Sequence, residues 1–188
     1  MGTQGIIVYG SQYGTARRYA DELSRRTGMQ AVSYEGVDGL SSYGLVVFVG
    51  GLYAGGVMGL SETMKRFPLR PDQAMILGTV GLADPSDPSN IDSIRQSIRK
   101  QVPEALYGRI RIFHLRGGID YRKLTFRHRT MMTLLYGKVR NLPPERRNAE
   151  TEAFVDTYGK DVDFVDLSSL AGIQDEIGRL GMQEEGAS

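Results

Sequence analysis

The sequence contains no cysteine among its 188 residues. Disulfides, thiolate metal sites, iron–sulfur clusters and cysteine nucleophiles are therefore excluded, and any redox chemistry must come from a bound cofactor. Histidine is scarce as well, with only His114 and His128. Two isolated histidines do not predict a metal site, and a partly buried structural role is the simpler expectation for each.

Long hydrophobic runs are also missing. The longest ones, such as residues 44–50, have the length of a strand and fall short of the roughly 20 residues that a membrane-spanning helix needs. Residues 1–5 carry neither the cationic start nor the apolar stretch of a secretory signal. We therefore expect a cytoplasmic location.

Neither sign of charge is in excess overall. Lys and Arg number 23 against 22 Asp and Glu, a net charge of +1, which does not predict a nucleic-acid partner. The positive charges nevertheless gather late in the chain, whereas acidic residues are common after Glu150. The gathered cations are Arg122, Lys123, Arg127, Arg129, Lys138, Arg140, Arg146 and Arg147.

The chain alternates between strand-like and helix-like patterns. Short apolar runs rich in β-branched residues predict five buried strands, and residues at helical spacing follow most of them. Such alternation predicts a parallel sheet with helices on both faces, and five strands fit the doubly wound order 2-1-3-4-5. The predicted strands cover residues 5–9, 30–34, 45–49, 74–80 and 110–115.

The predicted helices have recognisable ends. Gly28 is placed to cap the first helix, Pro68 ends the second, Pro103 closes the third, and Ser168 or Ser169 caps the last. We interpret residues 1–188 as a single domain, with a frayed tail over 181–188.

One stretch is not part of this predicted alternation of strands and helices. Residues 117–166 form a predicted insertion in which 121–140 read as a basic amphipathic helix. Residues 141–147 follow as a loop because two consecutive prolines break the helical register. The cationic face fits either acidic lipid headgroups or the carboxylates of a substrate, although a run of charge is often only a solvated face. The apolar face carries Leu124, His128, Met131, Met132, Leu135 and Val139.

The turn after the first strand has the composition of an anion site. Hydroxyl residues and Gly14 stand between strand and helix, where unsatisfied amides can hold a phosphate without a lysine. The turn lacks the Gly-Lys-Ser/Thr of a Walker loop and the glycine spacing of dinucleotide folds, which disfavours nucleoside triphosphates and NAD.

Residues 9–16, Tyr-Gly-Ser-Gln-Tyr-Gly-Thr-Ala, resemble the phosphate loop of the flavodoxin family. Residues 49–56 stand where that family covers one side of the flavin ring, and residues 79–84 stand where it places its second flavin loop. The resemblance implies a three-layer α/β/α flavodoxin-like sandwich with FMN as cofactor. It implies FMN contacts, but no catalytic side chain and no metal ligand, at Ser11, Gln12, Tyr13, Gly14, Thr15, Ala16, Gly51, Leu52, Tyr53, Ala54, Gly55, Gly81, Leu82, Ala83 and Asp84.

Three of these positions leave alternatives open. Ala16 stands where the family usually has threonine, so Thr15 would have to supply that hydrogen bond. Tyr53 is the candidate for stacking on the flavin, but it could be an incidental residue of a glycine-rich loop. Asp84 could contact the flavin edge or simply begin the turn before Pro85.

Residues 113–122 and the basic insertion are similar to the menaquinone-dependent protoporphyrinogen oxidases of the flavodoxin type. This resemblance implies an FMN-dependent oxidoreductase of heme biosynthesis with a quinone and a tetrapyrrole as partners. In it, residues 121–140 would hold either the acidic tetrapyrrole or the inner face of a membrane near the flavin. The alternatives are an electron carrier that docks on redox proteins, and a flavodoxin fold that has lost its cofactor.

Overall fold

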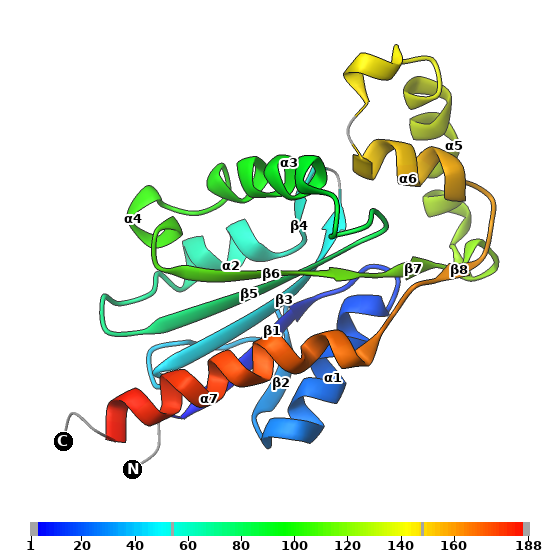
Figure 1. The fold of residues 1–188 in the computed structure, drawn as a ribbon. Coiled ribbons are helices and arrows are strands. Elements are labelled where there is room, and N and C mark those ends of the chain that lie inside the picture. Colours follow the sequence, from blue (N-terminus) through cyan, green and yellow to red (C-terminus); the bar gives the residue numbers. More distant parts are fainter. Residues whose placement is uncertain (1–3, 54, 148, 186–188) are drawn as a thin grey trace.

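A five-stranded parallel sheet forms the centre of the molecule (Figure 1). The computed structural model describes residues 4–53, 55–147 and 149–185. The strands are β1 (Gly5–Gly10), β2 (Gln30–Ser33), β3 (Leu45–Tyr53), β5 (Ala74–Gly81) and β6 (Ile110–Arg116). Their order β2-β1-β3-β5-β6 is the predicted doubly wound order, since the two-residue strand β4 (Gly56–Val57) only folds back antiparallel on β3.

Helices cover both faces of the sheet. Figure 1 shows α1 (Thr15–Thr27) and α7 (Ala171–Glu185) on one face, and α2 (Leu60–Arg66), α3 (Pro88–Arg99) and α4 (Glu104–Tyr107) on the other. The predicted α/β/α sandwich is confirmed. Gly28 caps α1 as expected, with φ of 73° and its N–H donated to the Ser24 carbonyl.

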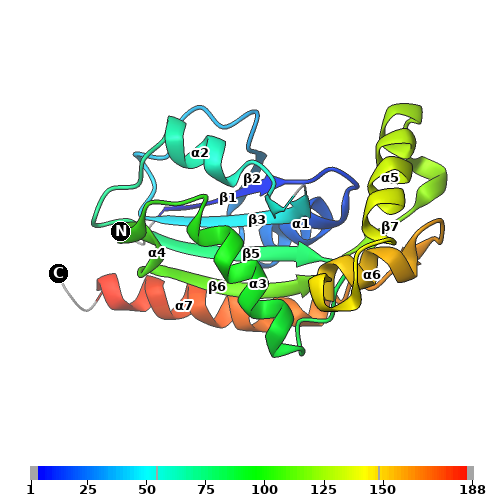
Figure 2. The ribbon, with the colours of Figure 1, turned by 90° about the horizontal axis from the view of Figure 1, so that it is seen from above.

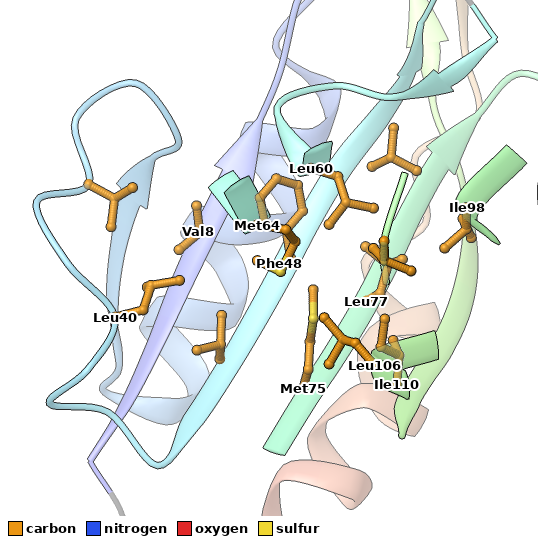
Figure 3. Close-up of a cluster of buried hydrophobic side chains, with 14 of the residues drawn as sticks. Val8, Leu40, Phe48, Leu60, Met64, Met75, Leu77, Ile98, Leu106 and Ile110 are labelled. Carbon is orange, nitrogen blue, oxygen red and sulfur yellow. The ribbon is translucent and has the colours of Figure 1, made fainter. Parts of the chain in front are cut away.

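The inner strands β1, β3 and β5 have a hydrophobic core on each side, which is why their sequences are largely apolar rather than alternating, whereas the edge strands β2 and β6 are partly exposed. Figure 3 shows the core beneath α2, α3 and α4, where Phe48 and Leu77 pack with Leu60, Met64 and Ile98. The core on the opposite face is built by α1 and α7 against the same strands, and its fully buried members include Ile7, Tyr19, Leu23, Val47, Ile76, Leu170 and Ile173.

The insertion projects beyond the carboxyl ends of the strands (Figures 1 and 2). It contains α5 (Phe126–Val139) and α6 (Ala149–Thr157), and its two stems pair as β7 (Gly118–Ile119) and β8 (Val162–Asp163). Short 3₁₀ turns lie at residues 121–123, 144–146 and 167–170. We call α5 and α6 together the lid.

Two details of the predicted elements are wrong. The basic helix begins at Phe126 rather than at residue 121, because Leu124 is extended and the Thr125 side chain caps the helix by accepting from the His128 N–H. Asp166, rather than a serine, caps the turn that leads into α7. The last helix, α7, extends to Glu185, and residues 186–188 of the expected frayed tail lie outside the described residues.

Candidate functional site

A cavity of about 570 Å³ lies at the carboxyl ends of β1, β3 and β5, beneath the lid. Ligands bind at this edge in open α/β sheets. Its walls are the turn after β1, the β3–β4 hairpin, the loop after β5 and the inner faces of α5 and α6. The volume is within the range of small-molecule sites.

The turn after β1 presents unsatisfied donors to this cavity. Gly14 has φ of 87°, with open space where a side chain would stand, and among the described residues no side chain caps the amino end of α1. The Ser11 hydroxyl is buried and has no partner in the described structure, and Thr15 also lines the cavity. Free amides, hydroxyls and the positive end of a 13-residue helix suit a phosphate.

The β3–β4 hairpin forms the second wall. The Gln101 side chain fixes it by accepting from the Val57 N–H at 2.7 Å and donating to the Val57 carbonyl at 3.1 Å, and the Ser97 hydroxyl donates to the Gly55 carbonyl. Leu52 and Tyr53 line the cavity from this hairpin. Its conformation is therefore set by α3 and the turn that follows it.

The loop after β5 forms the third wall. Leu82 and Ala83 donate their N–H groups to the Glu150 carboxylate of α6, each at 3.0 Å. Asn90 is one of the residues that line the cavity, and its amide donates to the Asp84 carbonyl at 3.2 Å, while its buried Oδ1 has no partner in the described structure. An unpaired buried acceptor at a cavity wall is suited to a ligand N–H or O–H group.

The lid forms an apolar roof. It lies across the first two walls, because Tyr53 donates to the Met131 sulfur at 3.2 Å and Tyr13 to the Met132 sulfur at 3.8 Å, while Gln12 Nε2 lies 3.1 Å from His128 Nε2. The roof is lined by Met131, Met132, Leu135, Val139 and Phe154.

Burial shifts the pKa values of Tyr13, in the site, and of His114, on the neighbouring strand β6. Desolvation, followed by the neighbouring Tyr53 and Tyr121 phenols, raises the pKa of Tyr13 to about 12, so its hydroxyl stays a neutral donor. Desolvation, followed by the charge of Arg95, lowers the pKa of His114 to about 4. His114 is neutral at pH 7, and its Nδ1 lies 2.7 Å from the Thr79 hydroxyl.

The structure brings most of the predicted flavin contacts together. Ten of them line the cavity: Ser11, Gln12, Tyr13, Thr15, Gly51, Leu52, Tyr53, Gly55, Gly81 and Leu82.

The other five predicted flavin contacts do not line the cavity or lie outside the described residues. Gly14 stands at the amino end of α1, and Ala16 is fully buried in the core beneath that helix. Ala83 is buried and contributes only its N–H toward Glu150. Asp84 is mostly exposed, accepts from the Ser86 N–H at 2.9 Å and lies outside the cavity wall, which is the turn-forming alternative. Ala54 lies outside the described residues.

Sequence reasoning missed the contributions of α3 and of the lid. The apolar spacing at 131–139 was a usable signal for the roof, but it predicted a packed helix face rather than a cavity wall. Asn90 and Glu150 carried no signal of their own. The cavity residues outside the prediction are Gly56, Met58, Val80, Asn90, Ser93, Ile94, Ser97, Gly117, Gly118, Ile119, the five roof residues, Glu150 and Thr151.

Two further observations concern the part of the chain that the structure describes. No group of three or more acidic, histidine or cysteine side chains there is arranged to hold a metal ion. None of its helices combines the length and the apolar character needed to cross a bilayer.

Comparison with known proteins identifies the family. The family model described as "Flavodoxin domain" matches residues 6–141, which is most of the chain. Among curated proteins, no match was found.

Two similar solved structures are candidate flavoproteins from Bacteroides. The one from Bacteroides eggerthii has 11% identity and a TM-score of 0.42, covering 60% of this chain and 86% of its own. The one from Bacteroides uniformis has 11% identity and a TM-score of 0.41, covering 62% and 90% respectively. Similarity at this level carries no weight beside the family match and the strand order. On those two findings, the chain belongs to the flavodoxin-domain family.

Proposed function

We propose that this chain binds FMN in the cavity beneath the lid and transfers electrons between an organic donor and a quinone. Membership of the family implies a flavin cofactor. The choice of FMN is supported by the turn after β1, where the free Ser11 hydroxyl and the uncapped amino end of α1 suit one terminal phosphate.

The walls also fit the remainder of the cofactor. Leu52 and Tyr53 on one side and Leu82 on the other bound a largely apolar space for a flat ring, and Asn90 Oδ1 offers an acceptor for a ring N–H. Bound flavin supplies the redox chemistry, taking electrons two at a time or singly, while the chain supplies binding and orientation.

The roof is the observation that favours an enzyme over an electron carrier. A carrier passes electrons through an exposed flavin edge, whereas here α5 and α6 enclose apolar space above the predicted ring position. We propose that this space takes a quinone or a tetrapyrrole, as in a protoporphyrinogen oxidase-type reaction. In each step the donor loses two electrons and two protons, and the quinone gains both and becomes the quinol.

The test is anaerobic oxidation of protoporphyrinogen by the FMN-loaded protein with a soluble menaquinone analogue, followed by porphyrin fluorescence. Leu135→Asp should lower the turnover at least tenfold without loss of FMN, because Leu135 lines the roof. Leu134→Asp is the matched control in this assay, which contains no vesicles, since Leu134 is 71% exposed on the outer side of the same helix. A protein that keeps its flavin spectrum but oxidises no protoporphyrinogen would refute the enzyme and favour the carrier.

The outer side of α5 supports a second part of the proposal, contact with an anionic membrane. Phe126 and Leu134 are 84% and 71% exposed, and they fall on one row of the helix with Lys138 while Arg127 flanks it. Exposed apolar side chains among cations suit the headgroup region of a bilayer.

Sedimentation with vesicles tests this contact. Vesicles that contain phosphatidylglycerol should bind the protein, neutral phosphatidylcholine vesicles should not, and the double variant Phe126→Ser/Leu134→Ser should lose the binding. Equal binding to both lipids, or to neither, would refute the membrane contact while leaving the flavin site untouched.

A further inference from the structure

Glu150 accepts hydrogen bonds from two backbone N–H groups that the proposed flavin would also use. Its two carboxylate oxygens accept from the N–H groups of Leu82 and Ala83, at 3.0 Å each. Both amides belong to the loop at the carboxyl end of β5. A side chain added at Gly81 would stand 2.9 Å from Glu150 Oε2, so the carboxylate lies close against this wall of the cavity.

Such a contact excludes a second acceptor at the same donors. A pair of adjacent amides forms one small donor site, and a carboxylate bound through both oxygens fills it with charge-assisted hydrogen bonds. The pyrimidine edge of a flavin carries carbonyl oxygens that seek backbone N–H donors of this kind. Either Glu150 or the flavin can hold the amides of Leu82 and Ala83, but not both.

Glu150 belongs to the lid, so the competition involves more than one side chain. The two helices of the lid are linked by aromatic contacts. The ring of Tyr136 in α5 stacks at 3.9 Å on that of Tyr158, directly after α6, and the Tyr158 hydroxyl donates to Thr133 of α5 at 2.8 Å. These contacts join α6 to α5, and the hydrophobic cluster around them also includes Tyr13 and Leu82 from the cavity walls. Displacing Glu150 from the loop after β5 therefore frees one of the contacts that hold the lid over the cavity.

We propose that Glu150 is an internal competitor for the flavin ring, so that cofactor binding and the position of the lid are coupled. This inference rests on the proposed flavin site and adds a residue outside the family's loops. When a side chain of the protein occupies the site of a ligand, the apparent affinity for that ligand is reduced in proportion to the fraction of molecules in which the site is free. Removal of the carboxylate should therefore strengthen cofactor binding.

The experiment compares FMN dissociation constants, measured by quenching of flavin fluorescence, for the full-length protein and its Glu150→Gln and Glu150→Ala variants. We expect the Kd to fall about tenfold in Glu150→Ala and by a smaller factor in Glu150→Gln, which keeps one acceptor oxygen. Glu152→Gln is the matched control, because Glu152 is exposed on the same helix and lies outside the cavity wall. Its Kd should stay at the wild-type value.

Riboflavin separates competition from simple charge repulsion. It lacks the phosphate, so loss of a negative charge alone would strengthen FMN binding but not riboflavin binding, whereas competition at the ring predicts the same factor for both. Hydrogen exchange gives a readout independent of affinity. FMN should raise exchange in α6 of the wild type, and Glu150→Ala should show that raised exchange without FMN.

Failure of the competition and failure of the flavin site give different results. An unchanged or weaker affinity in Glu150→Ala, or a gain confined to FMN, would overturn the competition while leaving the flavin site in place. Failure of the wild type and all variants to bind either flavin would overturn the proposed function, and the competition with it.

Discussion

The hydroxyl of Tyr19 joins the two ends of the insertion to α1, and its removal should be costly. Tyr19 is fully buried, donates to the Arg116 carbonyl at 2.8 Å and accepts from the Asp166 N–H at 3.0 Å. Arg116 ends β6 just before the insertion, and Asp166 stands at its far end. Tyr19→Phe keeps the ring packing but deletes both hydrogen bonds. At about 1 kcal/mol for each, the free energy of unfolding should fall by about 2 kcal/mol.

Urea denaturation measures this loss directly, and a thermal melt should show a decrease in Tm of about 6 °C for a chain of this size. Tyr43→Phe is the matched control, because the Tyr43 ring also packs against a core but its hydroxyl has no hydrogen bond among the described residues. Its change should stay below about 0.5 kcal/mol. If the two variants lose the same stability, the hydroxyl of Tyr19 does not hold the insertion and the reasoning is refuted.

Three further predictions concern stability. Gly10→Ala should lower the free energy of unfolding by more than about 3 kcal/mol, because its Cβ would stand 2.0 Å from the Met58 carbonyl oxygen, whereas Gly108→Ala meets open space and should melt near the wild type. Phe48→Ala should cost about 4 kcal/mol in urea denaturation, since Phe48 is fully buried; a loss below about 1 kcal/mol would contradict the core in Figure 3. The pKa of His114 is lowered in the folded chain, so between pH 6.5 and about 4 the unfolded chain binds a proton at this residue and the folded chain does not. The free energy of unfolding should therefore decrease as the pH falls from 6.5 to about 4. That acid loss should be smaller in His114→Gln, and an identical pH profile would exclude His114 as its source.

The inner strands of the sheet could be predicted because they are buried on both faces. Runs such as residues 45–49 and 74–80 are continuously apolar, as is typical of parallel strands covered by helices on both sides. By contrast, β4 is only two residues long and contains Gly56, so neither periodicity nor propensity could reveal it. It forms because Gln101 binds it from a distant part of the chain.

Only the part of the candidate site that is formed by the loops after β1, β3 and β5 could be predicted from the sequence. Ala16 was assigned to the cofactor by its place in a motif, yet it shares a helical face with Tyr19, Ala20 and Leu23, and that spacing places it in the core. Glu150 illustrates the opposite case. An acidic residue in the first turn of a helix is ordinarily a favourable interaction with the helix dipole, so nothing local signals its contact with Leu82 and Ala83.

The start of α5 shows how local chemistry can override periodicity. The apolar spacing from Leu124 onward is helical, but the helix begins only at Phe126 because the Thr125 side chain caps it. The pattern still gave the correct inner face, since Met131 and Met132 both line the cavity wall.

The most direct test of the central claim is the ratio of the affinities for FMN and riboflavin. If the turn at residues 11–15 holds a phosphate, the wild type should bind FMN about a hundredfold more tightly than riboflavin. The double variant Ser11→Ala/Thr15→Val should reduce that ratio to a few fold while leaving the riboflavin affinity unchanged. A wild-type ratio near one would contradict the account, because the phosphate would then make no contact with the turn between β1 and α1.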